Sequence, residues 1–449
     1  MTDHYESAKK FLKEPSKVDW HDETLWWVRK KRDRAAGEVD EWEELREAAS
    51  NIKERALAEL DSNLMEFEQK AIANGITVHW AASAEKHNEI ISDLLRERNI
   101  SRVVKSKSML TEECGLNPYL ENHGIEVVDT DLGERILQWK EHAPSHIVMP
   151  AIHLKKKEIG KIFAEKLKIP ESDDPQLLTE TARQHLRGYF LHSKAALTGV
   201  NFAVADTGAF VVCTNEGNAD MGVHLADVHI ASMGIEKLLP KTEDLAVFLR
   251  LLARSATGQP ITAFTSHFKK PARGKEIHLI LVDNGRSAIL GKRGFWKVLK
   301  CIRCGACMNT CPVFRKAGGH SYHSTIPGPI GAILAPHYDS EKYGSLPFAS
   351  SLCGSCTAVC PVKIDIDRQL YAWRQELTRG NGSQLLVSLI GKALQRNKLY
   401  DRLGVFLSMI QRRFPWIVNR VLKAYTQSRS LPDVPAESFK EWYKRNRDE

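Results

Sequence analysis

The sequence predicts an α/β domain with a parallel-rich sheet, followed by a cysteine-rich module without strands. Three observations support this fold class. Between residues 76 and 290, β-rich runs alternate with helical stretches over short links, which is typical of parallel strands joined by crossover helices. From Gly291 onward the β-rich pattern disappears, and seven of the nine cysteines lie between residues 301 and 360. With 449 residues, the chain is expected to form two or three compact units.

The first 75 residues predict an N-terminal helical region. The stretches 24–37 and 41–75 carry apolar residues at three- and four-residue spacing, the period of a helix with one buried side. Gly75 stands in the usual position to end the second helix. The apolar side of that helix is formed by Trp42, Leu45, Ile52, Leu60, Leu64 and Phe67.

The α/β domain is predicted over residues 76–290. A hairpin is expected over 201–215, because β-rich runs flank the turn-forming residues 206–208. Helices are expected near 90–95 and 110–122. The other expected strands are 76–81, 102–107, 125–130, 146–150, 227–232, 261–266 and 276–285.

Two cysteine runs predict iron–sulfur chemistry. The first, Cys301 to Pro312, has the spacing C-x2-C-x2-C-x3-C-P. In bacterial ferredoxins with this spacing, three thiolates bind one cluster and the fourth binds the other. The second run, Ser350 to Pro361, repeats the pattern with Ser350 in place of the first cysteine. Crossing the ligands assigns Cys301, Cys304, Cys307 and Cys360 to cluster 1, and Cys311, Cys353 and Cys356 to cluster 2.

Cluster 2 lacks a fourth thiolate in this assignment. The expected type is [4Fe–4S] for both clusters. Cluster 2 could instead be [3Fe–4S], take Ser350 or water as a ligand, or be completed by a partner protein. Structural zinc is the alternative, but seven cysteines with this spacing, each run followed by proline, fit a four-ligand zinc site poorly.

Four stretches resemble a known family. CIRCGACMNTCPVFRKAGGHSYHSTIPGPIGAIL and LPFASSLCGSCTAVCPVKIDI resemble LutB, the iron–sulfur protein of bacterial lactate utilisation. VKSKSMLTEECGLNPYLENHGIEVVDTDLGERILQ and TGVNFAVADTGAFVVCTNEGNADM resemble the LUD domain of that family. The resemblance covers most of residues 75–380. It implies a LUD fold like that of sugar-phosphate isomerases and CoA transferases, an all-helical ferredoxin-like module over 291–380, and a C-terminal extension over 381–449.

The same resemblance implies a function. It implies a subunit that carries electrons as L-lactate is oxidised to pyruvate, with two partners: a cysteine-rich protein of the heterodisulfide-reductase type and a second LUD-domain protein. The family has seven cluster cysteines, which match the seven named above. The absence of a cysteine at Ser350 is therefore part of the family's pattern. One alternative is a self-sufficient hydroxy-acid oxidoreductase with its substrate site in the LUD domain. The other, a zinc-stabilised nucleic-acid-binding protein, depends only on the basic tail, and no nucleic acid is expected.

A ligand site in the α/β domain is a further hypothesis. Open α/β sheets bind ligands at the carboxyl ends of their strands, where KSKS (105–108) and TNEGNAD (214–220) are expected to lie. Lys105 and Lys107 would attract an anion, and Glu216 stands beside the flexible Gly217. No G-x-G-x-x-G or Walker A sequence supports nucleotide binding. Four further candidates for catalysis or ligation are His185, His192, His320 and His323, whereas Cys114 and Cys213 are expected to be ordinary buried thiols.

The charge of the chain is concentrated at its C-terminal end. Residues 381–449 contain 13 lysines and arginines against 6 acidic residues, and so carry +7 of the total of +8. Basic residues beside apolar ones suggest docking on an acidic partner, or peripheral contact with an anionic membrane. The sequence has no signal peptide and no apolar stretch long enough to cross a bilayer, so a cytoplasmic location is expected.

Overall fold

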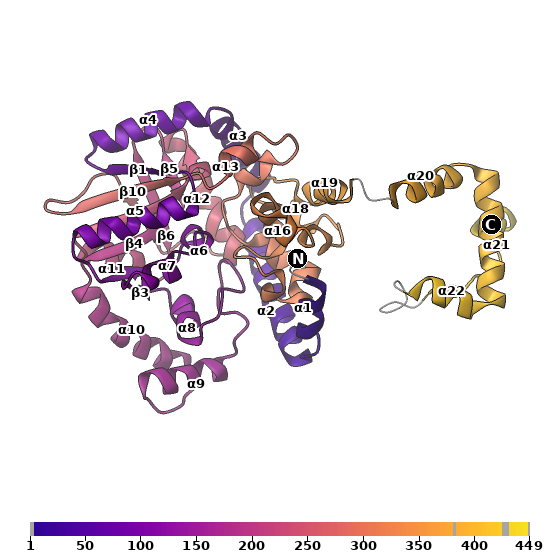
Figure 1. The fold of residues 1–449 in the computed structure, drawn as a ribbon, viewed down its shortest axis with the longest axis horizontal. Coiled ribbons are helices and arrows are strands. Elements are labelled where there is room, and N and C mark those ends of the chain that lie inside the picture. The colour runs from indigo at the N-terminus through magenta and orange to yellow at the C-terminus, as the bar shows by residue number, and fades with distance from the viewer. Residues whose placement is uncertain (1–3, 380–382, 424–430, 448–449) are drawn as a thin grey trace. The chain divides into compact units, whose positions relative to one another are not determined.

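The computed structural model describes residues 4–379, 383–423 and 431–447, and the chain divides after Leu377 into two units. The predicted boundary between residues 380 and 381 lies outside the described residues. Figure 1 shows the order of the elements.

Four helices form the N-terminal part: α1 (His4–Phe11), α2 (Pro15–Gly37), α3 (Trp42–Ala58) and α4 (Leu60–Ala73). The helix expected over 41–75 is thus interrupted at Glu59, where the backbone leaves the helical region. Helix α2 begins earlier than expected because Pro15 occupies its first turn, where the missing N–H costs no hydrogen bond. Helix α2 contacts both the α/β domain and the cysteine module.

Six parallel strands form the main sheet, in the order β1-β10-β7-β4-β2-β3. This confirms the predicted parallel-rich sheet. The strands are β1 (Thr77–Ala81), β2 (Arg102–Lys105), β3 (Glu126–Asp129), β4 (Ala195–Gly199), β7 (Val228–Gly234) and β10 (Glu276–Val282). Alternate residues face opposite sides: Val103 and Val127 pack in one apolar core, Val104 and Val128 in another. Both faces are therefore buried, as parallel sheets require.

Helices cover the main sheet (Figure 1). The core on the Val103 side includes Ile91 and Leu95 of α5 and Leu120 of α7. The helices of this region are α5 (Ala84–Glu97), α6 (Met109–Glu113), α7 (Leu116–Asn122), α8 (Leu132–Lys140), α9 (Lys156–Leu167), α10 (Pro175–His192) and α11 (Asn218–Leu225).

A second sheet has the order β8-β5-β6-β9. Its strands β5 (Phe202–Val204) and β6 (Ala209–Thr214) form the predicted antiparallel hairpin. Strand β9 (Phe264–Phe268) pairs with β6, and β8 (Leu238–Leu239) pairs with β5. The short helix η1 (Ile235–Lys237) and helix α12 (Thr242–Thr257) flank β8 in the chain.

The strand expected over 146–150 is wrong. These residues form a tight loop, in which the Ser145 backbone N–H donates to the Pro150 carbonyl oxygen at 3.0 Å. His146 Nδ1 accepts hydrogen bonds from the backbone N–H groups of Val148 and Met149, at 3.0 and 3.1 Å. The imidazole thus accepts the hydrogen bonds of two backbone N–H groups that, in a strand, would donate to a neighbouring strand.

The cysteine module follows α13 (Arg286–Leu290). Its described part consists of short helices: η2 (Trp296–Lys300), α14 (Ala306–Thr310), α15 (Pro312–Ala317), η3 (Gly319–Tyr322), α16 (Gly328–Tyr338), α17 (Ser340–Tyr343), η4 (Leu346–Phe348), α18 (Ser355–Ala358) and α19 (Ile366–Thr378). Helix α16 is buried from Gly328 to Pro336 and forms the centre of this module.

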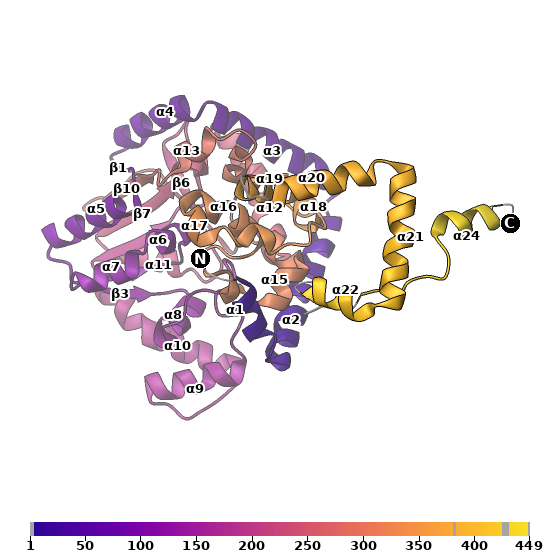
Figure 2. The same cartoon turned by 45° about the vertical axis from the view of Figure 1, so that its right-hand side comes forward.

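The C-terminal unit contains α20 (Ser383–Leu394), α21 (Asn397–Arg413), α22 (Pro415–Val421) and α24 (Phe439–Arg445). Figure 2 shows α20, α21 and α22 following one another with sharp turns. Large apolar side chains on these helices are exposed, among them Val405, Trp416 and Phe439. No helix in the described ranges is both long and apolar enough to span a bilayer.

Buried histidines are expected to make the fold less stable in acid. Burial lowers the pKa of His87 to about 4 and those of His146 and His229 to about 3. Each histidine stays neutral in the fold but takes up a proton when unfolded below pH ~6.5. The free energy of unfolding should therefore fall from pH ~6.5 towards pH 4, by up to ~1.4 kcal/mol per pH unit per histidine. Urea unfolding at several pH values measures this slope. A His229→Gln variant should have a shallower slope, and an unchanged slope would contradict the argument.

Candidate functional site

Four of the predicted ligands surround one small cavity. Cys301, Cys304, Cys307 and Cys360 all line it, although Cys360 comes from the second run. Cys301 follows η2, Cys304 precedes α14, Cys307 lies in α14, and Cys360 follows α18. Apart from these thiols the walls are mainly apolar and include Ile147, Ile302, Ile330, Val362, Ile364 and Ile366. The tertiary fold thus brings together the residues that the crossed assignment gives to cluster 1.

The other three cysteines form a second group. Burial raises the pKa of Cys356 to about 12, and the nearby Cys311 and Cys353 contribute to the same shift. Burial also raises the pKa of Cys311, and Cys353 again adds to it. Cys353 is exposed, whereas Cys311 and Cys356 are buried. These are the three residues that the crossed assignment gives to cluster 2.

The donor set fits iron–sulfur clusters. Backbone N–H groups of Arg303, Phe314 and Ile364 donate to the sulfurs of Cys301, Cys311 and Cys360, each at 3.4 Å. Such hydrogen bonds stabilise thiolate ligands and adjust cluster potentials. Among the described residues, no three His, Cys, Asp or Glu side chains converge as ligands of a single metal ion. In an iron–sulfur cluster, by contrast, each cysteine binds a different iron atom, so the ligand sulfurs lie farther apart than around a single ion.

Gly305 allows the first run to pack against the α/β domain. Its φ is +77°, in the left-handed region that favours glycine. A Cβ at this position would lie 3.1 Å from His146 Cε1 and 3.2 Å from Val148 Cγ2. The loop 145–150 therefore approaches the backbone between Cys304 and Cys307 closely.

Two arginines from the N-terminal helices reach the second run. Arg46 of α3 donates to the Cys360 carbonyl oxygen through Nε at 3.1 Å and Nη2 at 2.9 Å. Arg32 of α2 donates to the Val359 carbonyl oxygen at 3.2 Å. The sequence analysis missed both, because the contacts depend on how distant segments pack. Only the helical register of the two arginines could have suggested a buried position.

Replacing Arg46 with glutamine is expected to lower the potential of cluster 1 by tens of millivolts. A positive charge nearby stabilises the reduced cluster, and a unit charge at about 10 Å contributes ~1–2 kcal/mol at an effective dielectric constant of ~20. A redox titration followed by EPR measures the change. Arg55→Gln is the matched control, because Arg55 lies on the same helix and its side chain is 67% exposed. Equal potentials in both variants would contradict this role.

Ser350, which stands where the missing cysteine would be, takes part in a turn. Its hydroxyl accepts a hydrogen bond from the Leu352 N–H at 3.1 Å, and its carbonyl oxygen accepts one from Arg374 at 2.6 Å. Tyr322 is fully buried, and its hydroxyl has no hydrogen-bond partner among the described residues. Cys311, Cys307 and Cys356 all act on the pKa of Tyr322, which burial raises. Tyr322 is therefore close to cysteines of both groups.

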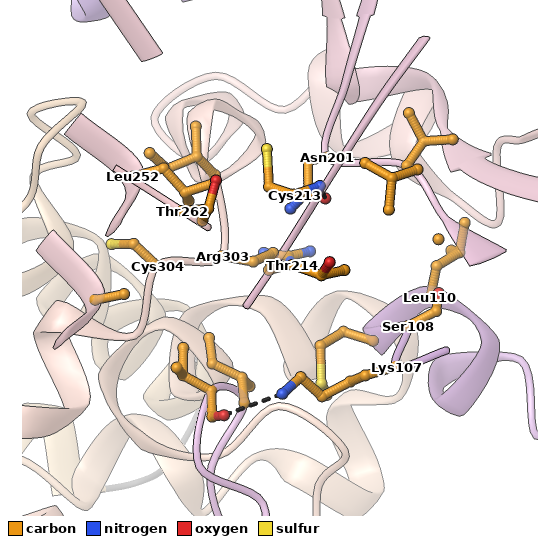
Figure 3. Close-up of a pocket in the computed structure, with 18 of the residues that line it drawn as sticks. Lys107, Ser108, Leu110, Asn201, Cys213, Thr214, Leu252, Thr262, Arg303 and Cys304 are labelled. Carbon is orange, nitrogen blue, oxygen red and sulfur yellow. Dashed lines mark hydrogen bonds between the residues drawn. The ribbon is translucent and has the colours of Figure 1, made fainter. Parts of the chain in front are cut away.

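A pocket of about 390 Å³ lies at the carboxyl ends of the parallel strands (Figure 3). The two predicted stretches meet in it: Lys107 and Ser108 follow β2, Thr214 ends β6, and Glu216 and Asn218 follow β6. Lys105, however, was wrongly expected to offer its ammonium group to a ligand. It is fully buried, and its Nζ lies 2.7 Å from Asp129 and 3.1 Å from Glu112.

The cysteine module closes one side of this pocket. Ile302, Arg303 and Cys304 belong to its lining, together with Glu236 and Lys237 of η1. Burial opposes the ionisation of Glu236, but Arg286, Lys237 and Arg303 outweigh it and lower the pKa of Glu236 to about 2. Burial lowers the pKa of Lys237 to about 8. The pattern of the sequence did not indicate these residues, because they come from two domains.

The remaining candidates have local roles. His185, His192, His320 and His323 line neither cavity. His192 and His320 hydrogen-bond to backbone carbonyl oxygens, His323 to Ser7 and His185 to Arg135. Burial raises the pKa of Cys114 to about 12 and that of Cys213 to about 11, consistent with inert thiols. Cys213 also lines the pocket, which the sequence did not predict.

Comparisons with known proteins agree with both parts of the site. The LUD domain family matches residues 64–288, and the 4Fe–4S dicluster domain family matches residues 297–364. A solved structure of a DUF162 family protein from Deinococcus radiodurans covers 50% of this chain and 98% of its own, with 14% identity. Its TM-score of 0.28 is too low to support an argument.

Curated relatives match nearly the whole chain. A protein of Bacillus cytotoxicus named "Lactate utilization protein B" is 42% identical over 432 residues, which are 92% of this chain and 91% of the relative. Proteins of the same name from Macrococcus caseolyticus and Bacillus thuringiensis are each 41% identical over 92% of this chain, and over 91% and 90% of their own lengths. The chain therefore belongs to the lactate utilization protein B family, and joins a LUD domain to a 4Fe–4S dicluster domain.

Proposed function

We propose that this chain is the electron-carrying subunit of a multi-protein complex that oxidises L-lactate to pyruvate in the cytoplasm. One observation carries the proposal: cysteines from both runs surround a single apolar cavity, as a protein-bound redox cluster requires. The names of the relatives supply the substrate. When bound, the clusters would accept and pass on single electrons.

In this proposal the seven cysteines hold the clusters in the crossed arrangement. Cys301, Cys304, Cys307 and Cys360 bind cluster 1 as [4Fe–4S], and Cys311, Cys353 and Cys356 bind cluster 2. Cluster 2 is either [3Fe–4S], or [4Fe–4S] with a fourth ligand that is not cysteine. The short helices of the module support a ferredoxin-like arrangement of the two sites.

The proposed partners are a cysteine-rich protein of the heterodisulfide-reductase type and a second LUD-domain protein. The exposed Cys353 supports electron exchange near cluster 2, since it places one ligand at the surface. The exposed apolar and basic residues of α20, α21, α22 and α24 support docking on a partner, or peripheral membrane contact.

The test uses the full chain purified without oxygen from cells grown on lactate. We expect iron and sulfide in the protein, a cluster EPR signal after reduction, and co-purification of both partners. L-lactate should reduce the clusters only when the partners are present. Zinc without iron would contradict the proposal.

A second function, a self-sufficient hydroxy-acid oxidoreductase, is favoured by one observation. The pocket in the LUD domain has Cys304 in its wall, so a substrate would lie beside cluster 1. Reduction of the clusters by L-lactate in the chain alone would support this alternative.

A further inference from the structure

The pocket and the cysteine cavity share a wall. Ile147, Ile302 and Cys304 line both. In Figure 3, Arg303 lies between Cys304 and Thr214, and Ser108 lies beyond Thr214. A small molecule in the pocket would therefore be separated from the cavity by little more than the Cys304 side chain.

The wall beside Cys304 carries an excess of positive charge. Arg286 is neutralised there by Glu113 at 3.0 Å and Glu236 at 2.7 Å. Arg303 has only a distant partner, with 4.0 Å between its Nη2 and Glu236 Oε1. Lys237 donates to the Cys301 carbonyl oxygen at 3.3 Å and forms no ion pair within the described ranges. Three cations thus face two carboxylates, and the thiolates of the proposed cluster 1 offset part of this charge.

The acids farther from Cys304 do not cancel this excess. Lys107, which also lines the pocket, pairs with Asp131 at 3.1 Å. Glu216 also lines the pocket, but its side chain is exposed. An anion entering the pocket would therefore find its strongest attraction at Arg303 and Lys237.

The lining of the pocket also offers unused hydrogen-bonding groups. Asn218 is 8% exposed, and its Oδ1 has no hydrogen-bond partner in the described structure. Its Nδ2 donates to Thr130 Oγ1 at 3.1 Å, which directs the amide oxygen away from Thr130. The hydroxyl of Thr214 is also buried without a partner among the described residues. Buried polar groups are nearly always paired, so these groups point to a ligand that donates a hydrogen bond.

We propose that this pocket binds a small hydroxycarboxylate, with the carboxylate at Arg303 and Lys237 and the hydroxyl directed towards Asn218 and Thr214. The volume of about 390 Å³ is ample for a three-carbon acid and also admits longer ones. The choice of L-lactate as the probe rests on the proposed function; the anion site and the hydroxyl acceptor do not.

Calorimetric titration of the full chain, purified without oxygen, tests the proposal at pH 7. The probes are L-lactate, propionate, which lacks the hydroxyl, and lactamide, which lacks the charge. Each comparison compound should bind at least about tenfold more weakly than L-lactate, because a site built for a polar group rejects the analogue without it. Lys237→Gln should weaken L-lactate binding about tenfold, and Lys241→Gln, an exposed control nearby, should not.

Asn218→Ala gives the sharper readout. It should reduce the preference for L-lactate over propionate about tenfold, while leaving propionate binding unchanged. If Arg303 and Lys237 only balanced the charge of cluster 1, Asn218→Ala would not change the preference for L-lactate over propionate. L-lactate binding weaker than about 10 mM, or a preference unaffected by Asn218→Ala, would overturn the proposal.

The proposed function can fail separately. If the clusters are present and the partners reduce them with L-lactate, but the chain does not bind L-lactate, the pocket proposal is wrong and the electron-carrying role stands. If the chain contains no iron yet shows the expected binding pattern, the pocket proposal stands and the electron-carrying role is wrong.

Discussion

Replacing Cys360 with alanine is expected to abolish the EPR signal of cluster 1, although Cys360 belongs to the second cysteine run. It lines one cavity with Cys301, Cys304 and Cys307, and the other lining residues carry no side-chain donor that could replace the lost thiolate as the fourth ligand of a [4Fe–4S] cluster. Cys311→Ala should instead abolish the EPR signal of cluster 2, although Cys311 belongs to the first cysteine run. In each variant, bound iron should fall by roughly half, from about eight atoms to about four if both clusters are [4Fe–4S].

The measurement is iron and sulfide content together with EPR after reduction, on protein purified without oxygen. Cys301→Ala should lose the same signal as Cys360→Ala, and Cys353→Ala the same signal as Cys311→Ala. Cys114→Ala is the control, because Cys114 is a buried thiol outside both cysteine groups. The crossed assignment would be contradicted if Cys360→Ala lost the same EPR signal as Cys356→Ala and kept the signal that Cys301→Ala loses.

Replacing Lys105 with methionine is expected to destabilise the α/β domain by about 3–5 kcal/mol. The Lys105 side chain is fully buried, and its ammonium lies 2.7 Å from Asp129 and 3.6 Å from Glu134. Burial opposes the charge of Lys105, but the surrounding carboxylates outweigh it and raise its pKa. Without the ammonium, Asp129 would remain as a buried carboxylate with no counter-ion, which is the reason for the large effect.

Urea unfolding at pH 7.5 measures this loss. The matched control is Lys156→Met, since the Lys156 side chain is 66% exposed and lies 3.6 Å from Asp173. It should change the free energy of unfolding by less than ~1 kcal/mol. Relative to the unaltered protein, the Lys105 variant should recover part of its stability towards pH 5, because protonation neutralises the isolated carboxylate. A loss below ~1 kcal/mol, or no recovery in acid, would contradict the argument.

The sequence by itself determined the elements whose pattern is local. Strands β1, β2, β3, β7 and β10 and the hairpin were predictable, because alternating or continuous apolar runs decide which residues can lie in a sheet. The spacing of the cysteines predicted the cluster module, since close spacing alone brings three sulfurs together. The stretch after β2 was predictable as part of the pocket, because parallel strands end at one edge of their sheet. The stretch after β6 reaches the same pocket from the second sheet, where β6 pairs antiparallel with β5 and β9.

The tertiary structure alone decided what depends on contacts between distant segments. Strand β4, Ala195–Gly199, is small and alanine-rich, and it is a strand only because β2 and β7 pair with it on either side. The loop 145–150 bends because His146 accepts its N–H groups, which no periodicity reveals. The contact of Arg46 with Cys360 and the place of Cys304 in the pocket wall arise from packing between domains. The pattern of side chains along the sequence reflects local structure. These contacts instead depend on which surfaces of distant segments the folded chain brings together.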